Sequence, residues 1–334
     1  MRVPTGVFEV LPLNRLWASV LSVSIEEARF ARRGFQSTSL LQQAKLENIG
    51  ETFLTGFNLA LREPNLERLS AEANTLPVEM SGFFYEGAGM ASALLDGLVP
   101  WSSSRFQALL AGPGFAHKYM MHVGAGWALA RLPARWNRFL MKFDPLLRWL
   151  VLDGYGFHEG YFHWPKYVNR HASPPRSFSR EARCVFDQGL GRSLWFVTGA
   201  DANRLTVAIA GFAEGRRPDL WSGVGLACAY AGGIDDRAMR ELNVTAGTYR
   251  SCLQQGVTFA AKAREFAANQ AAHTEMACQV LCGMSGTAAA QCTDYSLAEV
   301  QEYGEDARYQ AWRGQIQKHF IEGDFIAESR QMEG

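Results

Sequence analysis

Asp187 and Arg192 place one acid and one base five residues apart in the largely apolar stretch 184–196. Aromatic side chains flank this pair, and Gly189 and Gly191 lie within it. An acid and a base in an apolar environment can transfer protons, because burial shifts their pKa values. A glycine inside a helix costs about 1 kcal/mol relative to alanine, so the two glycines indicate close packing or space for a ligand.

Glu86 lies in a second glycine-rich stretch, which is similar to a segment farther along the chain. Residues 85–93 and 221–229 share four of nine residues at an offset of 136. Weaker matches in the same order predict an internal duplication of about 45–140 in about 183–270. The alternative is that small residues recur by chance in a helical protein rich in alanine and glycine.

Four charges have no like charge at the equivalent position of the other repeat: Glu86, Asp96, Asp187 and Arg192. A charge that leaves water must be paired or functional. Asp187, Glu86 or Asp153 would therefore be a catalytic acid, and Arg192 would orient it or hold it ionised. The alternative is a structural network in which Asp187 and Arg192 pair with each other or with Glu86.

His158, Glu159 and His163 form a third group of chemical interest. On a continuous helix the two histidines would lie about 140° apart, so they would not share a metal ion. No metal site is predicted. Glu159 and His163 are four residues apart and would share a helical face, either as a buried acid and base or as a surface ion pair. His158 and Glu159 are therefore further candidate catalytic residues.

Large side chains near the glycine-rich stretches would shape a pocket for an apolar ligand. Aromatic faces in such a pocket stabilise positive charge that develops on the ligand. The candidates for substrate binding are Tyr85, Met90, Tyr155, Phe157, Trp195 and Trp221.

The sequence excludes several common enzyme classes. Gly-x-Gly occurs several times but never completes a dinucleotide motif, and there is no phosphate-binding Walker sequence. Small residues that let helices approach closely explain these glycines better. Asp235 and Asp236 do not continue as a DDxxD motif, and no GxSxG is present. No cofactor is therefore expected.

Composition predicts a globular protein without a nucleic-acid partner. Lysine plus arginine equals aspartate plus glutamate at 33 each, so the basic face needed for nucleic acid is not indicated. The six cysteines include no CxxC pair, which favours reduced thiols. Glu9 and Arg15 interrupt the N-terminal apolar residues, and no apolar run has the length of a membrane span. We expect a cytoplasmic protein without membrane insertion.

Helical spacing of apolar residues dominates the chain and predicts an all-α bundle. We expect ten to fourteen helices in a single domain, 1–334, with two pseudo-symmetric repeats that share one core. A connecting segment at about 141–182 would contain a basic linker, 170–181, and a C-terminal helical segment would span about 271–334.

Five blocks of the chain resemble a bacterial family of unknown function whose members are encoded beside enediyne and related polyketide synthase genes. The blocks are Ser24–Phe35, Phe84–Met90, Asp153–His158, Phe186–Phe196 and Trp221–Ala227. The resemblance implies a role in specialised metabolism, with a polyketide synthase as a partner to consider, but it transfers no catalytic residue.

These observations lead to one functional hypothesis and two alternatives. The hypothesis is an enzyme that isomerises or cyclises a small apolar substrate, similar to a polyene or an isoprenoid, by acid/base catalysis without a cofactor. One alternative is a non-catalytic protein that binds the polyene and serves a synthase. A terpene cyclase that ionises a diphosphate is the other, and it would need a magnesium-binding cluster that the sequence does not show.

Overall fold

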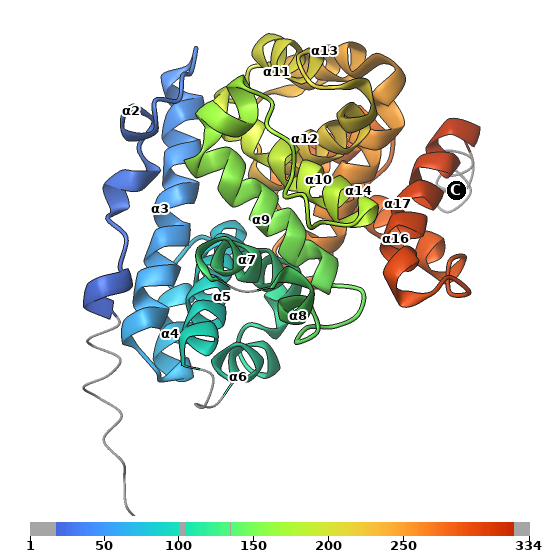
Figure 1. Cartoon of the computed structure of the whole chain (residues 1–334). Coiled ribbons are helices and arrows are strands. Elements are labelled where there is room, and N and C mark those ends of the chain that lie inside the picture. Colours follow the sequence, from blue (N-terminus) through green and yellow to red (C-terminus); the bar gives the residue numbers. More distant parts are fainter. Residues whose placement is uncertain (1–17, 100–103, 134, 324–334) are drawn as a thin grey trace, which may run out of the picture.

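The structure, a computed structural model, describes residues 18–99, 104–133 and 135–323. Glu9 and Arg15 lie outside these residues. Within them the chain is helical and contains no strand, which confirms the all-α prediction (Figure 1). There are more helices than expected, because short helices fill most connections. None of the helices in this described part is long and apolar enough to cross a membrane.

Nine longer helices form the body of the part of the chain that the structure describes. They are α3 (Leu40–Arg62), α5 (Ser81–Leu98), α7 (Lys118–Arg131), α9 (Arg148–Phe162), α10 (Arg180–Val197), α12 (Arg217–Ala231), α14 (Arg250–Phe266), α16 (Gly286–Ala298) and α17 (Glu305–Glu322). The last of these confirms the helix expected in the C-terminal segment.

Shorter helices connect the long ones. They include α2 (Phe30–Arg33), α4 (Leu66–Ala73), α6 (Arg105–Ala111), α8 (Trp136–Leu140), α11 (Ala202–Ala210), α13 (Asp236–Ala246) and α15 (Ala272–Ala277), together with the 3₁₀ turn η1 (Ile25–Ala28) and the π-helical turn η4 (Pro165–Asn169). The predicted linker at 170–181 is free of helix until α10 begins.

Side-chain caps define where many helices begin. Ser39, Ser104, Ser179 and Ser285 each accept a hydrogen bond from the backbone N–H three residues later, which satisfies one of the donors left free at a helix N-terminus. Asp96 accepts hydrogen bonds from two backbone N–H groups at the start of α6, at 2.9 and 3.0 Å. Its charge therefore has a structural role.

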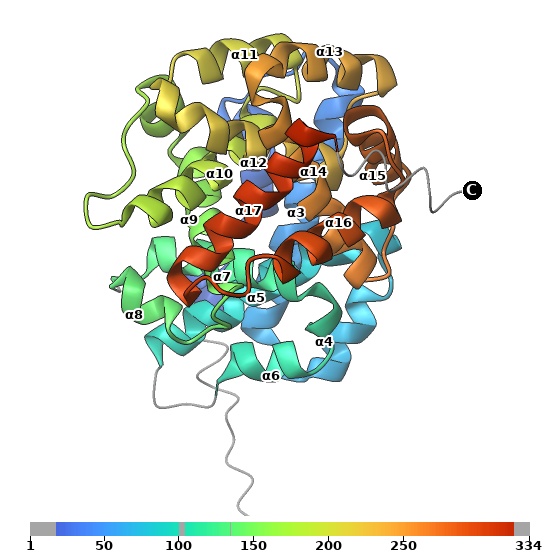
Figure 2. The ribbon, with the colours of Figure 1, turned by 90° about the vertical axis from the view of Figure 1, so that its right-hand side faces the viewer.

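Each long helix packs against the next one in the sequence, from α3 to α14 (Figures 1 and 2). Figure 2 shows α16 and α17 crossing one side of this array, where both contact α14. The buried apolar side chains form one cluster that reaches from Ala18 to Ile316. The helices therefore enclose a shared interior.

Pairs of glycines let successive helices touch backbone to backbone. A Cβ atom on Gly189 would overlap the carbonyl oxygen of Asp153 in α9, and one on Gly156 would overlap that of Phe186 in α10. Residue numbers rise in opposite directions across this contact, so the two helices are antiparallel. Equivalent contacts join the other neighbours through Gly56, Gly87, Gly124, Gly126, Gly154, Gly191, Gly223, Gly225 and Gly256.

These contacts confirm that the Gly-x-Gly sequences serve helix packing. Close approach gains van der Waals contacts and weak Cα–H···O bonds that offset the low helix propensity of glycine. The motif recurs in every long helix from α5 to α12, so the match between 85–93 and 221–229 does not require a two-fold duplication. The division into two repeats stays a prediction.

Candidate functional site

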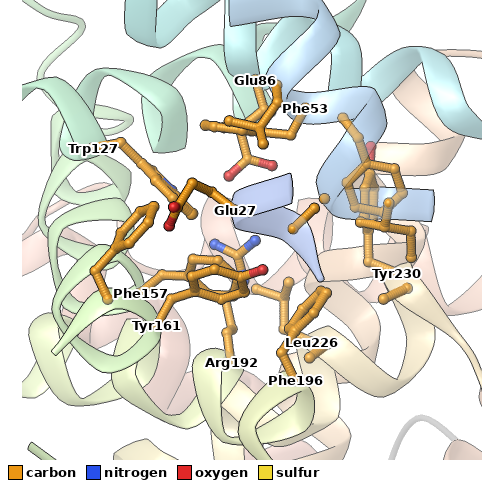
Figure 3. A pocket seen from close by; sticks show the side chains of 18 residues that line it. Glu27, Phe53, Glu86, Trp127, Phe157, Tyr161, Arg192, Phe196, Leu226 and Tyr230 are labelled. Atoms are coloured by element: carbon orange, nitrogen blue, oxygen red, sulfur yellow. The ribbon is translucent and has the colours of Figure 1, made fainter. Parts of the chain in front are cut away.

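An apolar pocket with a free internal volume of about 40 Å³ lies in the middle of the helix array. We call it the central pocket. Residues of η1, α3, α5, α7, α9, α10 and α12 line it. Its walls are mainly aromatic and include Phe53, Phe83, Trp127, Phe157, Tyr161 and Phe196 (Figure 3). A cavity with such walls suits an apolar, unsaturated ligand.

Several of the pocket side chains flank the glycine motifs of their helices. The residue before the first glycine and the residue after the second are four positions apart, so they share one helical face. In α10 the residue after the motif is Arg192, in α9 it is Phe157 and in α7 it is Trp127. Glu86 precedes the motif of α5. All four line the central pocket.

Glu86 is the buried carboxyl group of this pocket, with 3% of its surface exposed. Burial raises its pKa to about 7; nearby Asp153 acts in the same direction, whereas Arg192 lowers it. Among the described residues Glu86 has no ion-pair partner, because Arg192 pairs with Asp153 instead. Figure 3 shows the Glu86 carboxyl and the Arg192 guanidinium directed into the same space. Near neutral pH this carboxyl group can both donate and accept a proton.

Arg192 belongs to a polar network buried between the helices. Its Nη1 pairs with Asp153 Oδ1, and Gln188 Nε2 donates to Asp153 Oδ2 at 2.7 Å and to the Tyr309 hydroxyl at 3.2 Å. The pKa of Arg192 is raised because Asp153 and Glu86 outweigh the effect of burial. The guanidinium also lies 5.0 Å from the ring centroid of Phe157. The network therefore fixes Arg192 as a cation at the pocket wall.

Replacing Arg192 with methionine would test this arrangement. Asp153 is fully buried and would lose its only ionic partner among the described residues, so we expect a loss of about 3–5 kcal/mol in the free energy of unfolding. Urea denaturation measures this loss. Adding Asp153→Asn to the same chain should restore most of it, because the second change removes the unpaired charge. A double variant as unstable as the sum of the two single variants would contradict the pairing.

The raised pKa of Glu86 makes the stability of the protein depend on pH. The folded state retains a proton that the unfolded state releases, so this contribution is complete below about pH 4.5 and is lost as the pH rises to about 7. We expect the free energy of unfolding to fall by roughly 3 kcal/mol across this window, relative to a Glu86→Gln variant. Urea denaturation of both proteins from pH 4 to 8 measures the difference. Parallel profiles would contradict a buried, protonated Glu86.

Asp187 does not pair with Arg192 or Glu86, so that sequence interpretation is wrong. Its two oxygens accept hydrogen bonds from Arg216 Nη2 at 2.6 Å and Arg216 Nε at 2.8 Å. Burial raises the pKa of Asp187 to about 6, although Arg216 opposes this. On α10 the two charges are five residues apart, which turns them toward different neighbours. Asp187 does not line the central pocket.

His158, Glu159 and His163 lie together, which corrects the expectation that the histidines point apart. The helix α9 ends at Phe162, so His163 departs from helical geometry. Nδ1 of His158 is 3.1 Å from Glu159 Oε1, and Nδ1 of His163 is 3.3 Å from the same oxygen. One potential ligand atom from each residue lies within 4.8 Å of the others.

The neighbours of this cluster favour a hydrogen-bond network over a metal ion. Arg131 Nε donates to His158 Nε2 at 3.4 Å, so a neutral His158 carries its proton on Nδ1 and donates it to Glu159. The positive charge of the Arg131 guanidinium lies beside the atoms that would have to bind a metal cation, which disfavours the binding of a cation there. Burial lowers the pKa of His158. For Glu159 burial alone would raise the pKa, but the hydrogen bond and charge of His158, together with His163 and Tyr167, outweigh it and lower the pKa. None of these three residues lines the central pocket.

Of the six predicted substrate-binding residues, Phe157 alone lines the central pocket. Tyr85 stacks on His117 with ring centroids 4.8 Å apart, and Trp195 donates from Nε1 to the Gly232 carbonyl at 2.9 Å. Tyr155 packs against Phe178 and Phe186, whereas Met90 and Trp221 are buried in the core. Aromatic character near glycine was too general a criterion, because it did not separate the two faces of a helix.

Sequence reasoning missed most of the lining residues, among them Glu27, Trp127, Tyr161 and Tyr230. A usable signal existed for Trp127, which directly follows Gly124-Ala-Gly126 as Arg192 follows its own motif. Tyr161 lies one helical turn beyond Phe157 and shares its face. Glu27 comes from the turn η1, which packs on α3, and no spacing rule links it to the pocket.

The comparisons with known proteins place the chain in a family without assigning an activity. No curated protein matches the chain, and no solved structure does. A family model described as "Protein of unknown function (DUF1702)" matches residues 13–320, which is most of the chain. The chain therefore belongs to this family.

Proposed function

We propose that the protein binds an apolar, unsaturated small molecule in the central pocket and isomerises or cyclises it by proton transfer. The observation that carries this proposal is Glu86, a carboxyl group without an ionic partner among the described residues, directed into an aromatic pocket. A structural carboxyl at such depth would be expected to pair with a cation, as Asp153 does with Arg192.

The proposed reaction needs only the proton of Glu86. The neutral carboxylic acid adds a proton to one carbon of a double bond, and a positive charge develops on the conjugated carbons. Loss of a proton from another carbon to the Glu86 carboxylate moves the double bond. Attack by a second double bond, followed by the same proton loss, closes a ring. Both routes return the proton to Glu86 and involve no oxidation or reduction.

The other lining residues would bind and orient the ligand. The faces of Trp127 and Phe157 would stabilise positive charge on the ligand. Arg192, whose charge Asp153 balances, can donate a hydrogen bond to an oxygen substituent and so fix the position of the chain. Of the three candidate acids of the sequence hypothesis, Glu86 is therefore the one proposed here, because Arg216 holds Asp187 away from the pocket and Asp153 pairs with Arg192.

We also propose that the reaction belongs to bacterial specialised metabolism, with a polyketide synthase as the source of the substrate. The resemblance in the glycine-rich and aromatic blocks supports this link, and the apolar pocket suits a polyene or an isoprenoid-like intermediate. A soluble protein of the cytoplasm could receive its substrate from such a synthase. The proposed chemistry requires no metal or organic cofactor.

The test is incubation of the purified protein with candidate polyenes and isoprenoids in deuterated water. Proton transfer from Glu86 would place deuterium on carbon, and mass spectrometry would detect it in an isomerised or cyclised product. Binding should be measured in parallel by the fluorescence of cis-parinaric acid, a conjugated linear polyene. Binding without deuterium incorporation for any candidate would favour the non-catalytic binding protein, whereas neither binding nor turnover would contradict both functions.

A further inference from the structure

A second apolar pocket, also with a free internal volume of about 40 Å³, lies directly beyond the central pocket. We call it the distal pocket. Residues of α7, α9, α14 and α17 line it, including Met120, Leu150, Phe259, Ala260 and Trp312. It reaches Lys262, which pairs with Asp294 at 2.6 Å. The distal pocket therefore extends the apolar interior from the centre of the array toward α14 and α16.

The two pockets share three lining residues: Arg192, Leu226 and Tyr230. Arg192 is held in place by Asp153 and Phe157, which also line the distal and the central pocket, respectively. Leu226 and Tyr230 come from the same face of α12. The Tyr230 ring packs edge-on against Phe83, and the Arg264 guanidinium lies 4.0 Å from its centroid. These three residues therefore lie at the boundary between the two pockets.

We propose that the two pockets form one tunnel for an elongated, unbranched apolar chain, with the reacting part beside Glu86 and the tail in the distal pocket. This proposal rests on the proposed function. A linear chain can pass beside the fixed Arg192 guanidinium when the Leu226 side chain moves, whereas a wide polycyclic molecule would require the helices to separate. The close glycine contacts between α9, α10 and α12 oppose such a separation.

In such a tunnel, the distal pocket would limit the length of the apolar chain that the protein can bury. Each buried methylene contributes about 0.8 kcal/mol, so affinity should rise about four-fold per added carbon until the distal pocket is full. The probes are linear alkan-1-ols from hexanol to hexadecanol, which displace cis-parinaric acid from the wild-type protein. A plateau at a certain length would mark the end of the tunnel.

Ala260→Phe tests the path of the tail, because Ala260 lines the distal pocket and does not line the central one. We expect unchanged affinity for the short alkanols and at least a ten-fold loss for the long ones. Ala260→Leu should shift the plateau to an intermediate length, and it replaces the larger change if phenylalanine impairs folding. Ala227→Phe is the matched control, since Ala227 lines the central pocket alone and its replacement should weaken all lengths.

The outcomes separate failure of the tunnel from failure of the proposed function. A wild-type protein that binds short alkanols without any gain for longer ones would overturn the tunnel and leave the central pocket as a binding site. Ala260 variants that bind every length as the wild type does would also overturn it. No displacement or binding of any probe by the wild-type protein would overturn the proposed function and the tunnel together.

Discussion

Gly189→Ala is expected to destabilise the protein by about 3 kcal/mol or more, although alanine is the better helix former. The added methyl group would overlap the carbonyl oxygen of Asp153 and approach the backbone nitrogen of Phe157. Both neighbours are backbone atoms of α9, so no side-chain rotation relieves the overlap. The two helices would have to move apart, and Asp153 would move away from Arg192. Urea denaturation and the thermal midpoint would both report the loss.

Gly314→Ala is the matched control, because Gly314 lies within α17 and a Cβ atom there meets nothing within 4 Å. This exposed position should gain about 1 kcal/mol from the higher helix propensity of alanine. The same substitution should therefore have opposite signs at two helical sites in one chain. A stabilising effect at both positions would show that the glycines of the Gly-x-Gly motifs are not required for close packing.

Glu86→Gln is expected to lower turnover by about 10²–10⁴-fold once a substrate is identified, because an amide of nearly the same shape cannot donate the required proton. Binding of cis-parinaric acid should change little, since the pocket walls remain intact. The rate of the wild-type protein should fall as the pH rises through about 7, where Glu86 loses its proton. The measurements are single-turnover rates with deuterium incorporation and equilibrium fluorescence titration.

Asp187→Asn is the control for this change. Asp187 is another buried carboxyl with a raised pKa, but Arg216 holds it outside the central pocket. We expect this variant to lose stability, because Arg216 loses its charged partner, and to retain the turnover of the folded protein. If Asp187→Asn abolished turnover while Glu86→Gln preserved it, the catalytic acid would be Asp187, and the assignment of Glu86 would fail.

The spacing of apolar residues was sufficient to predict the helical class and several helix ends. Gly34, for example, directly follows Arg32 and Arg33, a pattern typical of a helix end, and has the left-handed φ of 74° that ends α2. The regular Gly-x-Gly sequences also indicate, by their residue types alone, that the helices pack closely. These properties are local, because capping and helix periodicity depend on residues within one or two turns.

Partner choice among the buried charges was decided by the tertiary structure. The sequence singled out Glu86, Asp153, Asp187 and Arg192, but it could not show that Asp153 takes Arg192 and that Arg216 takes Asp187. These partners come from different helices, and a turn of 100° per residue separates side chains that are close in the sequence. Glu86 is left facing an aromatic pocket as a consequence of these pairings.

The position of a residue relative to its glycine motif connects the sequence with the tertiary structure. The residues that flank Gly-x-Gly face the interior, because the glycines themselves must face the neighbouring helices. Glu86, Trp127, Phe157 and Arg192 follow this rule and line the pocket. The Gly-x-Gly spacing on which the rule depends is visible in the sequence. Without the contacts of the glycines, however, nothing in the sequence specifies which helix lies on which side, and that choice determines the shape and charge of the site.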